Sequence, residues 1–344
     1  MNLISTYNIV FDSINNNLPT DIILFDFSNA FDKIDYNLLF LKLQKFSLHP
    51  QLYNILLEFL TNRSQFVIIN GCYSDVIPVT SGVPQGTILA PLLFSVYIND
   101  LFELNFSSHI RGFADDVKLL GTPGYNLQCD VTLLENWSKS NLMDVNIAKW
   151  AVIHFYACKK SYDYNFDGKV IPVQREAKDL GVIVDCDLSF KTHCLSVQKK
   201  SYMLVNLMFR NFKSKDPVLF VKLFNLYIYP VILYGFSFYG ASSLNTINEI
   251  EKILKYFSRR LWLRLYPHKN IPSYQARLKH FNMNPLERCR ARSDLHLVFK
   301  VVGGICCIPS MSIKFSPKCD YRIVINRIKT KGVKCFFVHR TFML

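Results

Sequence analysis

The distribution of apolar residues near the start of the chain predicts a helix followed by a buried strand. Apolar residues recur at helical spacing over residues 4–14. The run Asp21-Ile-Ile-Leu-Phe-Asp26-Phe27 then has the length and composition of a buried strand. Asp26 is therefore expected near the end of that strand.

Two amphipathic helices are expected next. Asp35 can cap a helix in which Tyr36, Leu39, Phe40 and Leu43 form one apolar face. Pro50 is suited to the first turn of another helix, which is expected to end near Leu60.

Two hairpins are predicted from strand-like runs on either side of short turns. Residues 65–69 and 72–79 flank Asn70-Gly71, a pair that favours a tight turn. Residues 109–114 and 117–120 are separated only by Asp115-Asp116. The second hairpin therefore places two adjacent carboxylates at its tip.

The remaining pattern is mostly helical. Ser81–Gly86 is a loop by composition, and a helical apolar face follows from Ile88 to Tyr97. Further helices are expected at 131–138, 195–212 and through most of 217–303, followed by a tail with short strand-like pieces.

One apolar stretch, Leu219–Tyr239, raises the alternative of a transmembrane helix. Lys222, Asn225 and Pro230 interrupt it, and its tyrosines are not gathered at two interfaces. A buried pair of helices is the favoured interpretation.

Charge is distributed unevenly over the 344 residues. Residues 1–150 carry 8 basic and 14 acidic side chains, a net charge of −6, whereas the remainder carries 32 and 12, a net charge of +20. A basic segment of this size favours a polyanionic partner over a merely solubilising surface.

The ten cysteines show no CxxC pair and no zinc-type spacing with histidine, and no secretory leader precedes them. They are expected to be reduced, mostly buried thiols. The expected location is intracellular, in the nucleus or the cytoplasm.

The Asp115-Asp116 pair is the main candidate for chemistry. Adjacent carboxylates repel each other, and a divalent cation removes that cost. With a third carboxylate, such a pair can hold two Mg²⁺ ions for phosphoryl transfer. Taken alone, the pair is also compatible with a solvated turn, and spacing alone does not bring Asp26 beside it.

Three longer motifs resemble the palm of reverse transcriptases from non-LTR (LINE-type) retrotransposons. They are Leu24–Ile34, containing Asp26-Phe-Ser-Asn-Ala-Phe-Asp; Ser81–Leu101, beginning Ser-Gly-Val-Pro-Gln-Gly; and Phe113-Ala-Asp-Asp116. Asn146–Lys149, before a strand-like Val152–Phe155, resembles the fourth motif. The likeness covers nearly the whole chain, because later segments resemble the downstream part of Jockey-like elements. These segments are Lys178–Val182, Leu188–Phe190, Tyr234-Gly235, Leu286–Arg288 and Asp294-Leu295.

The resemblance implies a role for individual residues. It assigns two Mg²⁺ (or Mn²⁺) ions to Asp26, Asp115 and Asp116, assisted by the Phe27 carbonyl, and proton donation to pyrophosphate to Lys149. It assigns contacts with the incoming nucleotide to Phe31, Gln85, Gly86 and Ala114. Phe31 would exclude a 2′-hydroxyl by its shape; the alternative is that Phe31 is an ordinary core aromatic. For Lys149 the alternative is an ordinary exposed lysine.

The basic part resembles a thumb and connection that hold the template–primer hybrid. Trp262 and Tyr266 could stack on bases or simply pack. The candidate phosphate contacts are Lys199, Lys200, Arg259, Arg260, Arg264, Arg288, Arg290 and Arg292.

The resemblance implies an α+β fold, in which an antiparallel palm sheet packed on helices is followed by a mostly helical, basic thumb. The expected segments are 1–155 (palm, with a remnant of fingers), 156–190 (palm end and connector), 191–305 (thumb-like) and 306–344 (a tail of uncertain structure). The implied activity is RNA-directed DNA synthesis with an RNA template, a DNA primer and dNTPs, without a membrane partner.

The sequence departs from the family pattern in a few places. Serine is usual at the position of Thr87, glycine or serine at that of Ala90, and threonine at that of Trp150. Met1 falls just before the first motif, where fingers segments are usual in the family. The chain is therefore expected to be truncated. The alternative function is a catalytically silent remnant that at most binds RNA.

Overall fold

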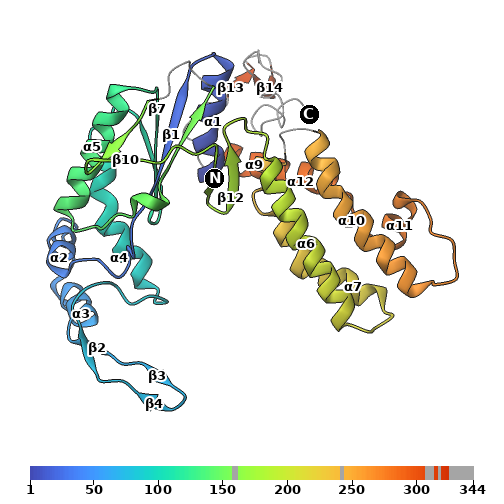
Figure 1. Ribbon diagram of the computed structural model, residues 1–344, viewed down its shortest axis with the longest axis horizontal. Coiled ribbons are helices and arrows are strands. Elements are labelled where there is room, and N and C mark those ends of the chain that lie inside the picture. The colour runs from blue at the N-terminus through green and yellow to red at the C-terminus, as the bar shows by residue number, and fades with distance from the viewer. Residues whose placement is uncertain (157–161, 241–243, 307–313, 317–318, 325–344) are drawn as a thin grey trace. The chain divides into compact units, whose positions relative to one another are not determined.

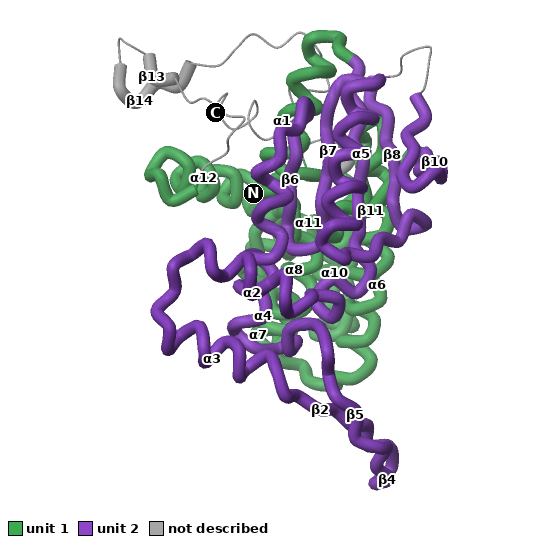
Figure 2. The backbone as a smooth tube through the Cα atoms, turned by 90° about the vertical axis from the view of Figure 1, so that its left-hand side faces the viewer, with its two compact units in different colours: residues 1–18, 175–344 green, residues 19–174 purple. Residues whose placement is uncertain are grey.

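The computed structural model describes residues 1–156, 162–240, 244–306, 314–316 and 319–324 (Figure 1). The chain divides into two compact units (Figure 2). Unit 2 is Pro19–Gln174, and unit 1 combines Met1–Leu18 with Arg175–Leu344. The first helix therefore belongs to the same unit as the C-terminal part of the chain, whereas the strand that follows it belongs to unit 2.

Unit 2 is built on a four-stranded sheet in the order β6-β7-β1-β8, with every neighbouring pair antiparallel. The strands are β1 (Thr20–Asp26), β6 (His109–Phe113), β7 (Asp116–Gly121) and β8 (Ala151–Phe155). The strands expected from the sequence are confirmed to within a residue or two at each end.

Four helices accompany this sheet: α2 (Tyr36–Gln44), α3 (Pro50–Leu60), α4 (Leu89–Ile98) and α5 (Tyr125–Ser140). The helix start expected at Asp35 is confirmed, because its carboxylate accepts a bond of 2.9 Å from the Leu38 amide. In Figure 1, α2, α4 and α5 lie along one side of the sheet.

The core of unit 2 lies between the sheet and these helices. Since side chains alternate along a strand, Ile23 and Phe25 of β1 face the helices and Asp26 faces the opposite way. Residues from each element complete this core, including Leu39, Leu56, Leu93, Phe94, Leu134 and Trp137.

A buried polar group links α2, α4, α5 and the short helix Asn99–Glu103 within this core. The Lys42 ammonium donates to the Tyr97 carbonyl at 2.5 Å and to the Asp100 carboxylate at 2.9 Å. The indole Nε1 of Trp137 donates to the same carboxylate at 3.0 Å. The lysine charge is thus paired and hydrogen-bonded, as a charge with so little exposure must be.

The Asn70-Gly71 hairpin is confirmed and extends away from the sheet (Figure 1). Its inner pair is β3 (Ile68–Ile69) with β4 (Cys72–Tyr73), and its outer pair is β2 (Arg63–Gln65) with β5 (Ile77–Val79). A shorter hairpin joins β9 (Asn165–Phe166) and β10 (Lys169–Val170), and the turns η1 (Asn99–Glu103) and η2 (Ile147–Lys149) precede β6 and β8.

Unit 1 is mainly helical. The Tyr7 hydroxyl of α1 donates to the Asp179 carboxylate of β11 at 3.0 Å, which joins the first helix to a strand 172 residues later. The elements are α1 (Asn2–Asn15), β11 (Glu176–Asp179), β12 (Val182–Asp185), α6 (Lys191–Asn211), α10 (Leu244–Leu265), α11 (Tyr274–His280), α12 (Leu286–Val302), β13 (Lys314–Ser316) and β14 (Cys319–Val324).

The stretch Leu219–Tyr239 is helical but does not form the expected pair of helices. It contains α7 (Pro217–Leu223), a π-helical turn (η3, Phe224–Ile228), α8 (Tyr229–Leu233) and α9 (Phe236–Tyr239). Pro230 has no N–H to donate to the preceding turn, which accounts for the irregular ladder. Among the described helices, none combines the length and apolar character needed to cross a membrane.

The expectation that most cysteines are buried is wrong for those that the structure describes. All six are free thiols, but only Cys194 is buried; Cys72 is exposed, on a hairpin without a second layer, and Cys129, Cys186, Cys289 and Cys306 are partly exposed. The side chains of Cys158, Cys307, Cys319 and Cys335 lie outside the described residues.

His193 of α6 should make the stability of unit 1 depend on pH. Burial lowers the pKa of its imidazole from 6.5 to about 4. Its Nδ1 faces the Ile183 amide at 3.3 Å, and its Nε2 has no hydrogen-bond partner among the described residues. Since the unfolded chain takes up this proton near pH 6.5 and the folded chain only near pH 4, stability is lost as the pH falls between these values.

We predict that lowering the pH from 7 to 5 costs about 2 kcal/mol of unfolding free energy through this residue. Urea unfolding of the wild type and of His193→Gln at both pH values measures the difference. Equal pH dependence in the two proteins would show that His193 is not responsible.

Candidate active site

Two carboxylates lie opposite each other at one end of the central strand pair. Asp26, the last residue of β1, is in direct register with Asp116, the first residue of β7. Directly opposed residues in an antiparallel pair place their side chains on the same face of the sheet. Asp26 and Asp116 therefore lie together although ninety residues separate them in the chain.

Asp115 lies in the tight turn beside this pair. Phe113 of β6 pairs with Asp116 of β7, so Ala114 and Asp115 alone form the turn. Ala114 has a φ of 53°, a left-handed conformation that is unfavourable for a residue with a Cβ atom. The expected hairpin is therefore present, but its turn lies one residue earlier than predicted, and Asp116 is paired in β7.

A lysine engages the first of these carboxylates. The Lys149 ammonium lies 2.9 Å from Asp26 Oδ2. The hydrogen bond with Asp26 raises the pKa of Lys149, and the charges of Asp26 and Asp115 raise it further. Within the described part of the chain, no three or more His, Cys, Asp and Glu side chains are grouped so that they could hold a metal ion. The side chains thus form a carboxylate pair with a lysine on Asp26.

The residue types expected as metal ligands, carboxylates and one carbonyl, are chemically suited to a hard divalent cation. Asp26, Asp115 and Asp116 are each partly exposed, so water and ions can reach them. Carboxylate and carbonyl oxygens are the ligands that Mg²⁺ prefers. Phe27, whose carbonyl was expected to assist, forms a bridge with Val145 and has a buried ring.

Trp150 fixes the backbone next to Lys149. Its indole Nε1 donates to the Asp26 carbonyl at 3.0 Å, and its buried ring packs edge-on against Phe25 and Phe166, each at 4.5 Å between centroids. The sequence marked Trp150 only as a departure from the family pattern. The bond to Asp26 could not be predicted from the sequence, because it joins residues 124 positions apart.

The loop Ser81–Gly86 is bonded to the segment that follows β1. The Val83 amide donates to the Phe31 carbonyl at 2.8 Å, and the Gly82 amide donates to the Ile34 carbonyl at 2.9 Å. The Gln85 amide nitrogen donates to the Asp32 carboxylate at 2.8 Å. Gln85 is thus held beside Asp32, the residue that follows Phe31, by a bond between their side chains.

Arg63 is a second residue whose role could not be expected from sequence. Its guanidinium donates to the Gly82 carbonyl at 2.6 Å and to the Tyr36 hydroxyl, and its Nε donates to the Leu60 carbonyl at 3.0 Å. Tyr36 also donates to the Gly82 carbonyl at 3.0 Å. The loop is therefore held to α2 and to the end of α3.

Phe31 packs on the core of unit 2. Its ring is stacked on Phe94 of α4 with 4.6 Å between centroids and 21° between planes, and it is partly exposed. A packing role and a nucleotide-facing edge are both compatible with this position.

The basic residues expected to contact nucleic acid fall into two groups. Arg264 donates to the Phe209 and Phe212 carbonyls at 2.8 and 2.5 Å, which satisfies the end of α6, and Arg260 donates to Asn206. Arg290 donates to the Gly240 carbonyl at 3.3 Å. The exposed members are Lys199, Lys200, Arg259, Arg288 and Arg292.

The two aromatic candidates in this region contact each other. Trp262 and Tyr266 lie 4.6 Å apart between ring centroids, and the Trp262 indole donates to the Asn270 carbonyl at 3.2 Å. Packing therefore accounts for Trp262 without a bound base.

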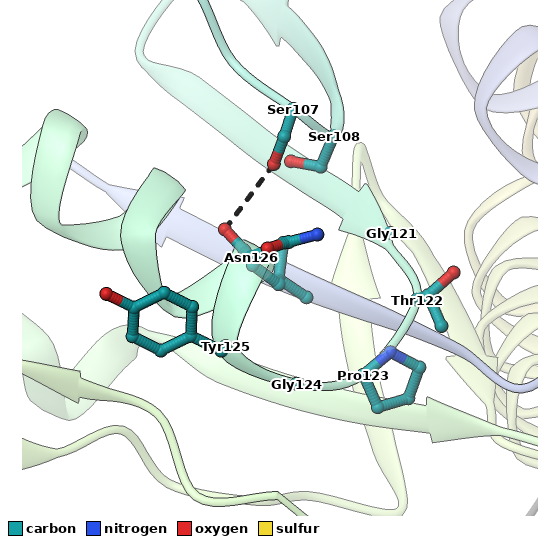
Figure 3. A pocket seen from close by; sticks show the side chains of 9 residues that line it. Ser107, Ser108, Gly121, Thr122, Pro123, Gly124, Tyr125 and Asn126 are labelled. Atoms are coloured by element: carbon teal, nitrogen blue, oxygen red, sulfur yellow. Dashed lines mark hydrogen bonds between the residues drawn. The ribbon is translucent and has the colours of Figure 1, made fainter.

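A pocket of about 360 Å³ lies elsewhere in unit 2, at the start of α5 (Figure 3). Ser107, Ser108 and Thr122 line it, together with the turn Pro123-Gly124. It adjoins Gly121, the last residue of β7, roughly 17 Å along the strand from Asp116 at 3.3–3.4 Å per residue. The pocket is therefore separate from the carboxylate site.

Comparison with known proteins identifies the class. Residues 8–184 match the family described as "Reverse transcriptase (RNA-dependent DNA polymerase)". This match covers half of the chain and includes every carboxylate of the site. The chain belongs to the reverse transcriptase family.

Curated relatives identify the branch as the non-LTR, LINE-type retrotransposons. The chain is 28% identical over 263 residues to the RNA-directed DNA polymerase from mobile element jockey of Drosophila funebris, and 26% identical over 255 residues to that of Drosophila melanogaster. It is 25% identical over 249 residues to a probable RNA-directed DNA polymerase from transposon BS of Drosophila melanogaster. These matches confirm the resemblance and cover 67–69% of this chain but only 27–28% of each relative.

Solved structures give weaker similarities. Telomerase of Candida albicans, in complex with a fragment of telomeric RNA, matches 82% of this chain and 52% of its own at 15% identity, with a TM-score of 0.40. Apo telomerase of Candida tropicalis, truncated from its C-terminal domain, matches 54% of this chain and 38% of its own at 15% identity, with a TM-score of 0.41. The family assignment does not depend on these two.

We predict that Gly82 tolerates no side chain. A Cβ there would lie 2.7 Å from the backbone of Asp32, at a φ of +79°, so Gly82→Ala should lower the unfolding free energy by about 2–4 kcal/mol. Gly86→Ala is the matched control, because Gly86 has a similar φ of +84° but open space around it; about 1 kcal/mol is expected. Chemical denaturation of both variants measures the two losses, and equal losses would contradict the close approach of loop and strand segment.

A further prediction concerns Trp150. Trp150→Phe keeps most of the ring packing but removes the bond to the Asp26 carbonyl, so a loss of about 1 kcal/mol is expected. Trp150→Ala also removes the packing and should cost about 3–5 kcal/mol. If urea denaturation gives the same loss of unfolding free energy for both variants, the packing of the Trp150 ring does not contribute to stability.

Proposed function

We propose that this chain catalyses RNA-templated DNA synthesis with two divalent metal ions. The observation that supports this most directly is the register pair Asp26–Asp116, with Asp115 in the adjoining turn. The family membership supplies the reaction: a primer 3′-hydroxyl attacks the α-phosphorus of a deoxynucleoside triphosphate, and pyrophosphate leaves.

Asp26, Asp115, Asp116 and the Phe27 carbonyl would hold the two Mg²⁺ or Mn²⁺ ions. Such ions, when bound, lower the pKa of the attacking hydroxyl and neutralise charge on the leaving group. Lys149 lies at the edge of the carboxylates with an exposed side chain. It would donate a proton to the departing pyrophosphate oxygen.

Phe31, Gln85, Gly86 and Ala114 would surround the incoming nucleotide. The bonds of Ser81–Gly86 to the segment after β1 support this grouping, since they hold Gln85 beside Asp32. Gly86 has open space where a side chain would stand, which allows a ligand to approach the backbone. Phe31 would exclude a ribose 2′-hydroxyl by its volume.

The helical, basic part would bind the template–primer hybrid through its phosphates. The exposed candidates Lys199, Lys200, Arg259, Arg288 and Arg292 support this. Arg260, Arg264 and Arg290 are expected to contribute mainly by holding helices together.

A catalytically silent remnant that at most binds RNA is the second candidate function. The exposed basic side chains Lys199, Lys200, Arg259, Arg288 and Arg292 are compatible with it, because they could bind RNA phosphates without any catalysis. RNA binding without DNA synthesis would then depend on the basic helices alone.

Primer extension on an RNA template distinguishes these functions. We predict extension by the wild type in Mg²⁺ or Mn²⁺ and a loss of at least about a hundredfold in Asp115→Asn or Asp116→Asn, because each substitution removes a negative charge from the metal site. Asp75→Asn, in the exposed hairpin, is the matched control and should retain activity. Identical traces for the wild type and Asp115→Asn would leave only the RNA-binding remnant.

A further inference from the structure

The ion pair between Lys149 and Asp26 has a consequence for metal loading. The Lys149 ammonium lies 2.9 Å from an oxygen of the carboxylate that would bind metal. We propose that Lys149 is a built-in counter-cation that competes with the divalent ion for Asp26 and is released when the ion binds. This inference rests on the proposed function, because it requires that Asp26 be a metal ligand.

Electrostatic repulsion among the carboxylates provides the reason for such a device. Asp26 and Asp116 are directly opposed on neighbouring strands, an arrangement that destabilises a sheet when both residues carry the same charge. Asp115 adds a third negative charge at the turn. A single positive charge on Asp26 reduces this repulsion, as a divalent ion would do more completely.

The geometry allows Lys149 to leave without a change in the fold. Its backbone is fixed, because its amide donates to the Asn146 carbonyl at 2.9 Å and the next residue, Trp150, is buried and bonded to the Asp26 carbonyl. Its side chain, however, is 63% exposed, whereas that of Asp26 is 25% exposed. The flexible stem can therefore move into solvent while its base stays beside the site.

The competition couples two events of the proposed reaction. A divalent ion that displaces Lys149 frees the ammonium at the edge of the site, where the leaving phosphates would be. By thermodynamic linkage, the factor by which the ion pair weakens metal binding equals the factor by which bound metal weakens the ion pair. Lys149 would therefore become available only in the metal-loaded site.

Mn²⁺ binding to the full chain tests this inference without measuring catalysis. Free Mn²⁺ is counted by its electron paramagnetic resonance signal as the ion is titrated into the wild type, Lys149→Gln, Lys149→Arg, Lys33→Gln and Asp115→Asn. Lys33→Gln is the matched control: Lys33 also forms an ion pair, at 2.8 Å with Asp144, but that carboxylate is not a proposed ligand.

Lys149→Gln should bind Mn²⁺ about three- to tenfold more tightly than the wild type, because both the competing pair and a nearby positive charge are gone. Lys149→Arg, which keeps the charge, should bind as the wild type does, and so should Lys33→Gln. Without metal, Lys149→Gln should have a lower melting temperature than the wild type. On addition of Mn²⁺, its melting temperature should rise by more than that of the wild type.

The outcomes separate this inference from the proposed function. If Asp115→Asn weakens Mn²⁺ binding but Lys149→Gln leaves it unchanged or weaker, the competition is refuted and the metal site stands. If Asp115→Asn has no effect on Mn²⁺ binding, the proposed metal site fails, and the competition fails with it.

Discussion

Repulsion between like charges is the constraint on which this site depends. The register of β1 with β7 places Asp26 directly opposite Asp116, and the two-residue turn adds Asp115. Each of the three carboxylates is partly exposed. A fold that keeps three such groups at one sheet end needs positive charge there, from a side chain or from an ion.

The surrounding structure fixes this end of the sheet through backbone contacts. Trp150 bonds the carbonyl of Asp26 from a buried position, while Arg63 and Tyr36 bond the carbonyl of Gly82 in the loop that adjoins the segment after β1. Few of these contacts involve the side chains proposed to act in chemistry. The bond from Trp150 therefore leaves the carboxylate of Asp26 available for its ion pair with Lys149.

Local patterns predicted most of unit 2. The cap at Asp35, the turn at Asn70-Gly71 and the carboxylates at the tip of a hairpin each follow from a few neighbouring residues, and all three are present. Contacts between distant residues could not be predicted in this way. Neither the register of Asp26 with Asp116 nor the Trp150 indole bond can be inferred from spacing, and only the family resemblance suggested that the carboxylates meet.

Other contacts of individual side chains depend on the fold and are not contained in a one-dimensional pattern. Arg264 bonds carbonyls at the end of α6 and Arg260 bonds the Asn206 side chain, which a count of basic residues does not predict; their contacts with nucleic acid stay a prediction. Cys72 is apolar enough to suggest burial but lies on an exposed hairpin. The ring of Phe31 stacks on Phe94, a contact between residues 63 positions apart that spacing does not predict.

The central claim is that Asp26 and Asp116 share a divalent ion. Anomalous diffraction from crystals soaked in Mn²⁺ tests it most directly. We expect a manganese peak in contact with the carboxylates of both residues. A saturated crystal whose manganese peaks all lie away from that pair, with Lys149 still on Asp26, would contradict it.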